Sequence, residues 1–118
     1  MPSREFRAEV RRVNNATVID LHGEIDALAE EALLNQAYGQ ATQQNPTMLV
    51  LNFQKVDYIN SKGIALIVGV LAKARRAGIR MLVYGLSEHY QEIFKITRLS
   101  DFMTIVSDEA TALDQIKN

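Results

Sequence analysis

The most constraining feature of this sequence is a strand-like apolar segment that leads, through one polar turn, into a long apolar segment with helical spacing. Residues 48–53 form a nearly continuous apolar run, which is typical of a strand buried on both faces of a parallel sheet. Residues 58–63 are mostly polar, and residues 64–77 repeat apolar side chains with a helical period. A buried strand followed directly by a helix indicates an α/β domain whose helices connect parallel strands.

The remaining segments support the same fold class. Residues 5–13 alternate between apolar and charged side chains, and residues 17–21 are largely β-branched, so we expect an antiparallel hairpin that turns at Asn14 and Asn15. Residues 22–25 are expected to form a loop, and Asp26 to cap the next helix. Further strands are expected at 48–53, 81–84 and 103–106. Helices are expected at 27–43, at 62–77 with Gly78 as its C-cap, after Ser87 and after Asp108.

These elements predict a single domain over residues 1–118. Its fold is α/β, with a mixed four- to five-stranded sheet that begins with an N-terminal antiparallel hairpin and is flanked by about four helices. We expect Leu99 and Phe102 to pack beneath the helix that follows Ser87.

Composition excludes several classes of function. The formal net charge of -1 gives no general attraction to nucleic acid or to an anionic membrane. The chain has no cysteine, which removes thiolate metal sites and thiol nucleophiles. Its longest nearly uncharged apolar run, residues 63–72, is about half of what spans a bilayer, and its N-terminus lacks the apolar stretch of a secretory signal. We therefore expect a cytoplasmic protein without membrane insertion, nucleic-acid partner, metal or cofactor.

The helix expected at 62–77, after Ser61, has two different faces. At about 100° per residue, the core face gathers Ile64, Ile67, Val68, Leu71 and Ala74. The opposite face gathers Lys62, Ala65, Gly69, Ala72, Lys73 and Arg76. Small residues replace the charged ones that a solvated helix face carries, and a glycine inside a helix costs about 1 kcal/mol relative to alanine. We interpret this face as a docking surface for another protein; the alternative is that small residues are merely tolerated there, or that Gly69 relieves crowding within the fold.

Ser61 stands where the polar turn meets this helix. A serine here fits the N-cap, where its hydroxyl accepts a hydrogen bond from an unpaired backbone N–H. The same end of the helix carries the positive pole of the helix dipole and can accommodate a phosphate. A capping serine needs no second role, so the residue by itself leaves a structural cap and a phosphorylation site as alternatives.

With these motifs in place, the chain resembles STAS domains, and specifically the bacterial anti-sigma factor antagonists, over nearly its whole length. The resemblance rests on residues 23–26 (Gly-Glu-Ile-Asp) and on residues 60–65 (Asn-Ser-Lys-Gly-Ile-Ala), which follow the strand at 49–53. Residues 84–86 (Tyr-Gly-Leu), 93–94 (Ile-Phe) and 99–101 (Leu-Ser-Asp) match near the C-terminus. Asn60 stands where the family usually has an aspartate, and Lys62 where it has serine or threonine.

The resemblance implies a non-catalytic switch. In this family, the unphosphorylated antagonist sequesters an anti-sigma factor, a serine kinase with the ATPase fold of the histidine-kinase type, and so frees a sigma factor for transcription. The kinase phosphorylates the antagonist, and a serine phosphatase reverses the modification. Carried over to this chain, the phosphorylation site is Ser61, and the partner-binding residues are Gly23, Glu24, Asp26, Asn60, Ser61, Lys62, Gly63, Ala65, Gly69 and Ala72.

Other functions stay open at this point. An enzyme is disfavoured because no acid–base constellation is apparent around His22 or His89, the only histidines, and residues 60–63 lack the glycine pattern of a phosphate-binding loop. A STAS module could instead serve as a scaffold subunit of a stress-signalling assembly, as a component of a lipid-transport system or as a nucleotide-binding module. A homodimer is a further alternative.

Overall fold

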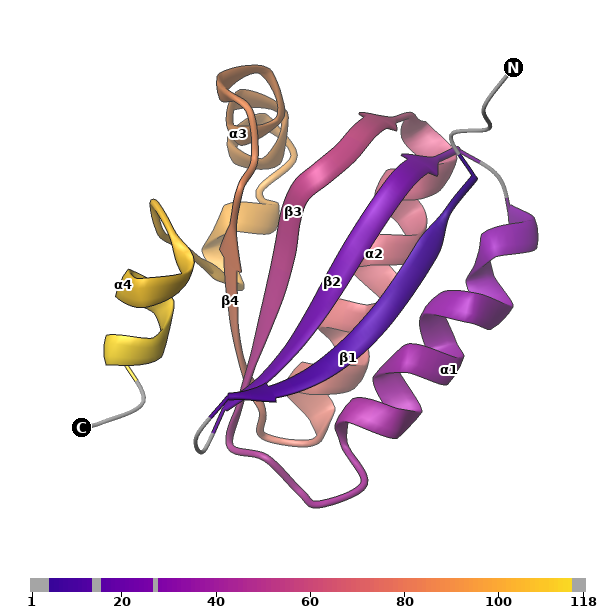
Figure 1. The fold of residues 1–118 in the computed structure, drawn as a ribbon. Helices are drawn as coiled ribbons and strands as arrows, with labels where there is room; N and C mark the ends of the chain where they lie inside the picture. The colour runs from indigo at the N-terminus through magenta and orange to yellow at the C-terminus, as the bar shows by residue number, and fades with distance from the viewer. Residues whose placement is uncertain (1–4, 14–15, 27, 116–118) are drawn as a thin grey trace.

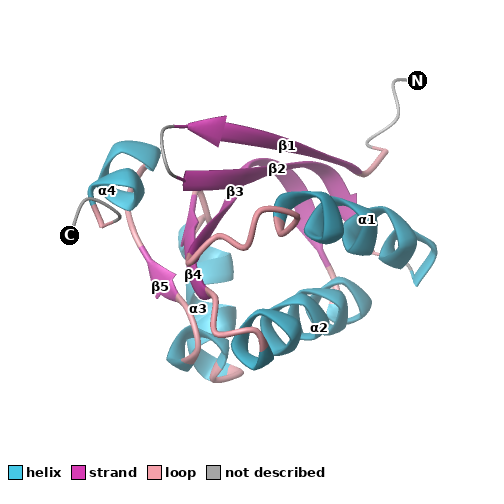
Figure 2. Ribbon diagram, turned by 90° about the horizontal axis from the view of Figure 1, so that it is seen from below, coloured by secondary structure: helices cyan, strands magenta, loops and turns pink. Residues whose placement is uncertain are grey.

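The structure, a computed structural model, describes residues 5–13, 16–26 and 28–115. The elements in chain order are β1 (Arg7–Val13), β2 (Ala16–Ile25), the short 3-10 helix η1 (Leu28–Glu30), α1 (Glu31–Ala41), β3 (Met48–Ile59), α2 (Ser61–Arg76), β4 (Arg80–Tyr84), α3 (Glu88–Ile96), the 3-10 helix η2 (Leu99–Asp101), β5 (Thr104–Ile105) and α4 (Glu109–Asp114). The five strands form one sheet in the order in which they occur in the chain. Figure 1 shows β1 to β4 in this order, and Figure 2 shows β5.

The sheet is mixed, as predicted. β1 pairs antiparallel with β2, whereas β2, β3, β4 and β5 are parallel to one another. The alternation of strands and helices and the N-terminal antiparallel pair are therefore confirmed. The turn predicted at Asn14 and Asn15 lies outside the described residues.

The helices divide the domain into layers. α1 and α2 lie side by side on one face of the sheet, and α4 covers part of the other face (Figure 2). The larger core fills the space between the sheet, α1, α2 and α3, and it includes Ile19, Leu49, Ile67 and Phe94. A smaller core lies beneath α4, where Ala112 packs on Val18, Val50 and Leu82. Successive residues of a strand point to opposite faces, so both faces of β2 and β3 contribute to a core.

Two strands are longer than the sequence predicts. Residues 22–25, expected as a loop, form the end of β2, because β3 continues to Ile59 and pairs with them. The register of this pair shifts between Asp20 and His22 and again between Gly23 and Glu24, with an extra residue in β3 each time. Gly23 has a φ of 85°, a conformation that favours glycine. A glycine among polar residues is typical of a loop, which explains the wrong prediction.

The helix after β2 is shorter than predicted. The segment 27–43 contains η1 and then α1, whose N-cap is Glu30 and not Asp26; residue 27 lies outside the described residues. Instead, the backbone N–H of Asp26 donates to the Glu30 Oε1 at 2.9 Å. Leu34, Ala37 and Ala41 of α1 are buried and Tyr38 packs against the same core, whereas Leu33 is exposed.

The later helix ends follow the sequence closely. The Ser87 hydroxyl accepts from the Tyr90 N–H at 3.3 Å, and the Asp108 carboxylate accepts from the Thr111 N–H at 2.8 Å, so both predicted N-caps are confirmed. Gly78, with a φ of 74°, follows the last residues of α2 in a Schellman-type ending, in which its N–H reaches the Arg75 carbonyl at 3.1 Å.

Candidate functional site

The turn between β3 and α2 is organised by Asn60. The sequence predicted Ser61 as the N-cap, but the structure corrects this by one residue: the Asn60 Oδ1 accepts from the Gly63 N–H at 3.0 Å, and Ser61 is the first residue of the helix. Asparagine and serine are comparably good N-caps, so composition alone could not choose between neighbours. Ser61 is exposed, and its hydroxyl is not used to cap the helix.

The same asparagine joins this turn to the end of β2. The Asn60 Nδ2 donates to the Asp26 carbonyl oxygen at 3.0 Å, and the Asn60 backbone N–H donates to the Ile25 carbonyl at 3.3 Å. The two segments that the sequence predicted as partner-binding, 23–26 and 60–63, are therefore brought together. Glu24 and Asp26 are half-buried, and Ser61 and Lys62 are exposed.

Gly23 and Gly63 lie beneath this surface and are both buried. A Cβ at Gly63 would overlap the carbonyl oxygen of Ile25, so glycine lets the first turn of α2 sit directly on the end of β2. Gly63 therefore sets how closely α2 approaches β2, and the neighbouring Ser61 and Lys62 are exposed.

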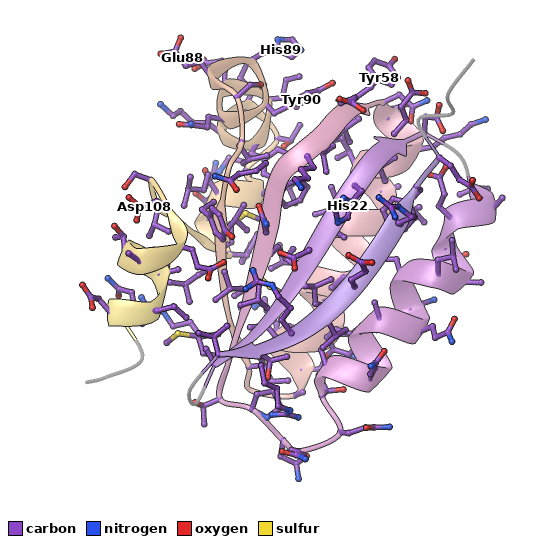
Figure 3. All side chains as sticks on the ribbon, in the orientation of Figure 1. His22, Tyr58, Glu88, His89, Tyr90 and Asp108 are labelled. Atoms are coloured by element: carbon purple, nitrogen blue, oxygen red, sulfur yellow. The ribbon has the colours of Figure 1, made fainter. Side chains whose placement is uncertain are left out.

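α3 supports the turn from the other side. β4 ends opposite Asn52, so the last residues of β3 have no β-strand partner on that side. There, the Ile59 N–H donates to the Tyr90 hydroxyl at 2.9 Å. Figure 3 shows Tyr90 on α3 and Tyr58 near the end of β3, at the end of the sheet where α2 begins. A buried backbone N–H without a partner is costly, so this bond helps to hold the strand that leads to Ser61.

We define the outer face of α2 by its residues Ser61, Lys62, Ala65, Val68, Gly69 and Ala72. Ala65 and Gly69 are exposed, Ala72 is half-buried, and Val68 is 43% exposed, so the assignment of Val68 to the core was wrong. The side of α2 that is buried is formed by Gly63, Leu66, Ile67, Val70, Leu71 and Ala74.

The basic end of α2 also differs from the prediction. Lys73 turns toward α1, where its Nζ donates to the Asn35 Oδ1 at 2.6 Å and lies 5.8 Å from the centre of the Tyr38 ring. The outer face of α2 is thus less basic than the sequence indicated, and its middle is formed by small and apolar side chains.

Leu28 is a further exposed apolar side chain near α2. It belongs to η1, which packs against α2, and it is 62% exposed. Leu28 and Val68 were not predicted as surface residues, although Gly63, Leu66, Val70 and Ala74 are spaced so that a second face of the helix could be buried. Exposed large apolar side chains beside small ones are typical of protein-binding surfaces.

Residues 7–112 match the family described as STAS domain. The chain belongs to the STAS domain family. The anti-sigma-B factor antagonist of Listeria monocytogenes is 29% identical to this STAS domain over 87 residues, which cover 74% of this chain and 75% of that protein.

Solved structures show the same fold. An anti-sigma factor antagonist from Mycobacterium paratuberculosis has a TM-score of 0.76 at 19% identity, with 98% of this chain and 97% of that chain covered. The Bacillus cell fate determinant SpoIIAA in its phosphorylated form has a TM-score of 0.68 at 22% identity, with 95% and 99% covered. These STAS relatives are named as antagonists or cell-fate determinants, not for a chemical reaction.

A polar network fastens α4 to the face of the sheet opposite α1 and α2 in this STAS domain. The Arg11 guanidinium donates to the Asp20 Oδ2 at 2.5 Å and to the Glu109 Oε1 at 2.6 Å, and the Tyr84 hydroxyl donates to the same Glu109 oxygen at 2.6 Å. Hydrogen bonds from Arg11 and then Tyr84 lower the pKa of Glu109. Burial raises the pKa of Tyr84, and its bond to Glu109 raises it further.

The histidines lie away from the turn that contains Ser61. His22 is on β2, on the face of the sheet opposite α1 and α2, with its Nε2 3.3 Å from the Glu9 Oε1 (Figure 3). His89 is exposed on α3, and the centre of its ring lies 4.9 Å from that of Tyr90 in an edge-on arrangement.

Within the described residues, no helix combines the length and the apolarity needed to cross a bilayer.

Proposed function

We propose that this STAS domain is an anti-sigma factor antagonist whose binding to its partner is switched by phosphorylation of Ser61. The observation that carries the proposal is the position of Ser61: an exposed hydroxyl at the first residue of a 16-residue helix, beside the segment that ends β2 and at the start of the outer face of α2. Similarity to anti-sigma factor antagonists supports the kind of partner.

The charges around Ser61 suit a phosphate. The first turn of α2 has no acidic residue, Lys62 is adjacent and exposed, and the Asn60 side chain is neutral. A phosphoserine would add about -1.5 to -2 charge, which the helix dipole and the Lys62 ammonium stabilise. The domain therefore stays folded after modification, whereas a partner packed on the small residues Ala65 and Gly69 meets a bulky, hydrated anion.

The proposed cycle uses two states of one surface. Unphosphorylated, the segment 23–26, the turn 60–63 and the outer face of α2 bind an anti-sigma factor that is a serine kinase of the histidine-kinase-type ATPase fold, and a sigma factor is released. The kinase then modifies Ser61, and a serine phosphatase restores it. Sigma factors act on RNA polymerase, so the proposal places the protein in the cytoplasm. A coupling of about 1–3 kcal/mol, the usual allosteric scale, would change the affinity about 5–150-fold.

Calorimetry with the anti-sigma kinase of the same organism tests the switch. We expect Ser61→Ala to bind like the unmodified protein and to take up no phosphate from ATP, and Ser61→Asp to bind at least about fivefold more weakly. Ser107→Asp is the matched control, because it adds the same charge before α4, on the other face of the sheet.

Equal affinities of the two Ser61 variants would exclude a phosphoserine switch. Phosphate on the Ser61→Ala protein would place the modification at another residue. If the native protein copurifies with other STAS proteins and no kinase, the function as a scaffold subunit takes precedence.

A further inference from the structure

A second candidate site lies at the opposite end of α2 from Ser61. A cavity of about 350 Å³ opens between the last turn of α2, the start of β4 and the segment that joins η2 to β5. Its lining comes from Arg75, Ile79, Arg80, Met81 and from residues 101–104. This volume lies at the lower end of the range for small-molecule sites, which is about 300–1,000 Å³. Fourteen residues of helix, roughly 21 Å, separate Arg75 from Ser61.

The charge in this cavity is positive. Arg75 and Arg80 both line it, and Arg80 donates to two neutral oxygens, the Gln115 Oε1 at 3.1 Å and the Thr104 Oγ1 at 3.5 Å. The single carboxylate of the lining, Asp101, is held at 2.6 Å by Arg98, which is not part of the lining. Within the described residues, neither Arg75 nor Arg80 forms an ion pair with a carboxylate, so both guanidinium groups can bind an anion in the cavity.

An aromatic ring stands beside these charges. The sequence predicted a buried Phe102, but the structure shows it 46% exposed, in contrast to the buried Leu99. The Arg75 guanidinium lies over the Phe102 ring, 4.4 Å from its centre, which holds both groups in place. Ile79, Met81 and Met103 add an apolar floor. An exposed aromatic ring in a cavity gains free energy when an apolar group covers it.

We propose that this cavity binds a small anionic amphiphile: a molecule with a carboxylate or phosphate at one end and a short apolar or aromatic part at the other. Guanidinium groups bind such oxyanions through paired, charge-assisted hydrogen bonds, and the Thr104 hydroxyl offers a further donor. The apolar part of the ligand packs on Phe102 and the methionines. This site shares no residue with the surface around Ser61, so the inference stands independently of the proposed function.

Titrations followed by NMR amide shifts test the site with defined probes. Phenyl phosphate and benzoate carry both features, benzyl alcohol lacks the charge, and inorganic phosphate lacks the ring. We expect the better of the two amphiphiles to saturate with a Kd of about 1 mM or lower, with shifts confined to residues 75–81 and 101–104, and the two incomplete probes to bind at least about tenfold more weakly. The stronger of phenyl phosphate and benzoate identifies the preferred anion.

Variants separate a built site from general attraction. Arg75→Gln, Arg80→Gln and Phe102→Ala should each weaken binding by about tenfold, whereas Arg12→Gln, an exposed arginine on β1, should leave it unchanged. The proposal is overturned if inorganic phosphate binds as well as phenyl phosphate, if the shifts spread over the surface, or if Arg12→Gln weakens binding as much as Arg80→Gln.

Discussion

Replacing Gly63 by alanine tests how closely α2 sits on the end of β2. Gly63 is buried in the first turn of α2, and an added Cβ would overlap the carbonyl oxygen of Ile25. The Cβ would also lie 2.8 Å from the carbonyl carbon of Ile25 and 2.9 Å from the Ile59 Cγ2. The nearest obstacles are backbone atoms, which cannot rotate away, so the helix and the strand must move apart.

Two opposing contributions set how much Gly63→Ala changes the free energy of unfolding. Alanine is favoured over glycine inside a helix by about 1 kcal/mol. Overpacking a tight site costs about 1–3 kcal/mol, and a clash with backbone belongs at the upper end of that range. We therefore expect Gly63→Ala to lower the free energy of unfolding by about 2 kcal/mol. Gly69→Ala is the matched control in the same helix: a Cβ there meets nothing within 4 Å, so only the helix gain of about 1 kcal/mol remains.

Urea unfolding measures both variants, with a constant m-value as the sign that only stability has changed. The two midpoints should move in opposite directions, and the double variant should show the sum of the two changes. If Gly63→Ala raises the urea midpoint as Gly69→Ala does, then α2 does not pack directly on Ile25. The close contact between segments 23–26 and 60–63 would then be refuted.

Three further predictions concern other parts of the domain. Asn60→Asp should lower the free energy of unfolding by about 1 kcal/mol in urea, because a carboxylate cannot donate to the Asp26 carbonyl; an unchanged midpoint would show that this bond is dispensable. Arg11 holds the pKa of Glu109 below 4.5, so this stabilisation is present above pH 4.5 and is lost as the pH falls through the folded-state pKa. Urea midpoints of Glu109→Gln should therefore fall less steeply below that pH than those of the wild type. Gly69→Gln should leave the Tm unchanged or raised but weaken partner binding at least about tenfold by calorimetry; wild-type affinity would refute docking on α2.

The sequence predicted the fold well because its main signals are local. The apolar run at 48–53, the alternation at 5–13 and the caps Ser87 and Asp108 each specify an element without reference to distant residues. The lengths of β2 and β3 were missed because they depend on pairing between segments far apart in the chain, with two irregularities in the register.

The exposed face of α2 was predicted only in part, for a related reason. α2 is apolar over most of its circumference, so two choices of buried face fit the sequence, and packing on the sheet selected the one that leaves Val68 outside. The cavity beside Phe102 combines residues 75–81 with residues 101–104. No local sequence pattern predicts this cavity, because the two segments come together only when β5 pairs with β4 at the edge of the sheet.

The two bonds of the Asn60 side chain have a consequence for how quickly and how tightly a partner can engage. They join the end of β2 to the first turn of α2 within the isolated domain, so the proposed partner-binding surface is preorganised before any encounter. These segments are ordered when the domain folds, so their ordering does not weaken the binding of a partner. Under the proposed function, a partner would meet segments that are already joined, and phosphorylation of Ser61 would change the affinity without a slow rearrangement of the backbone.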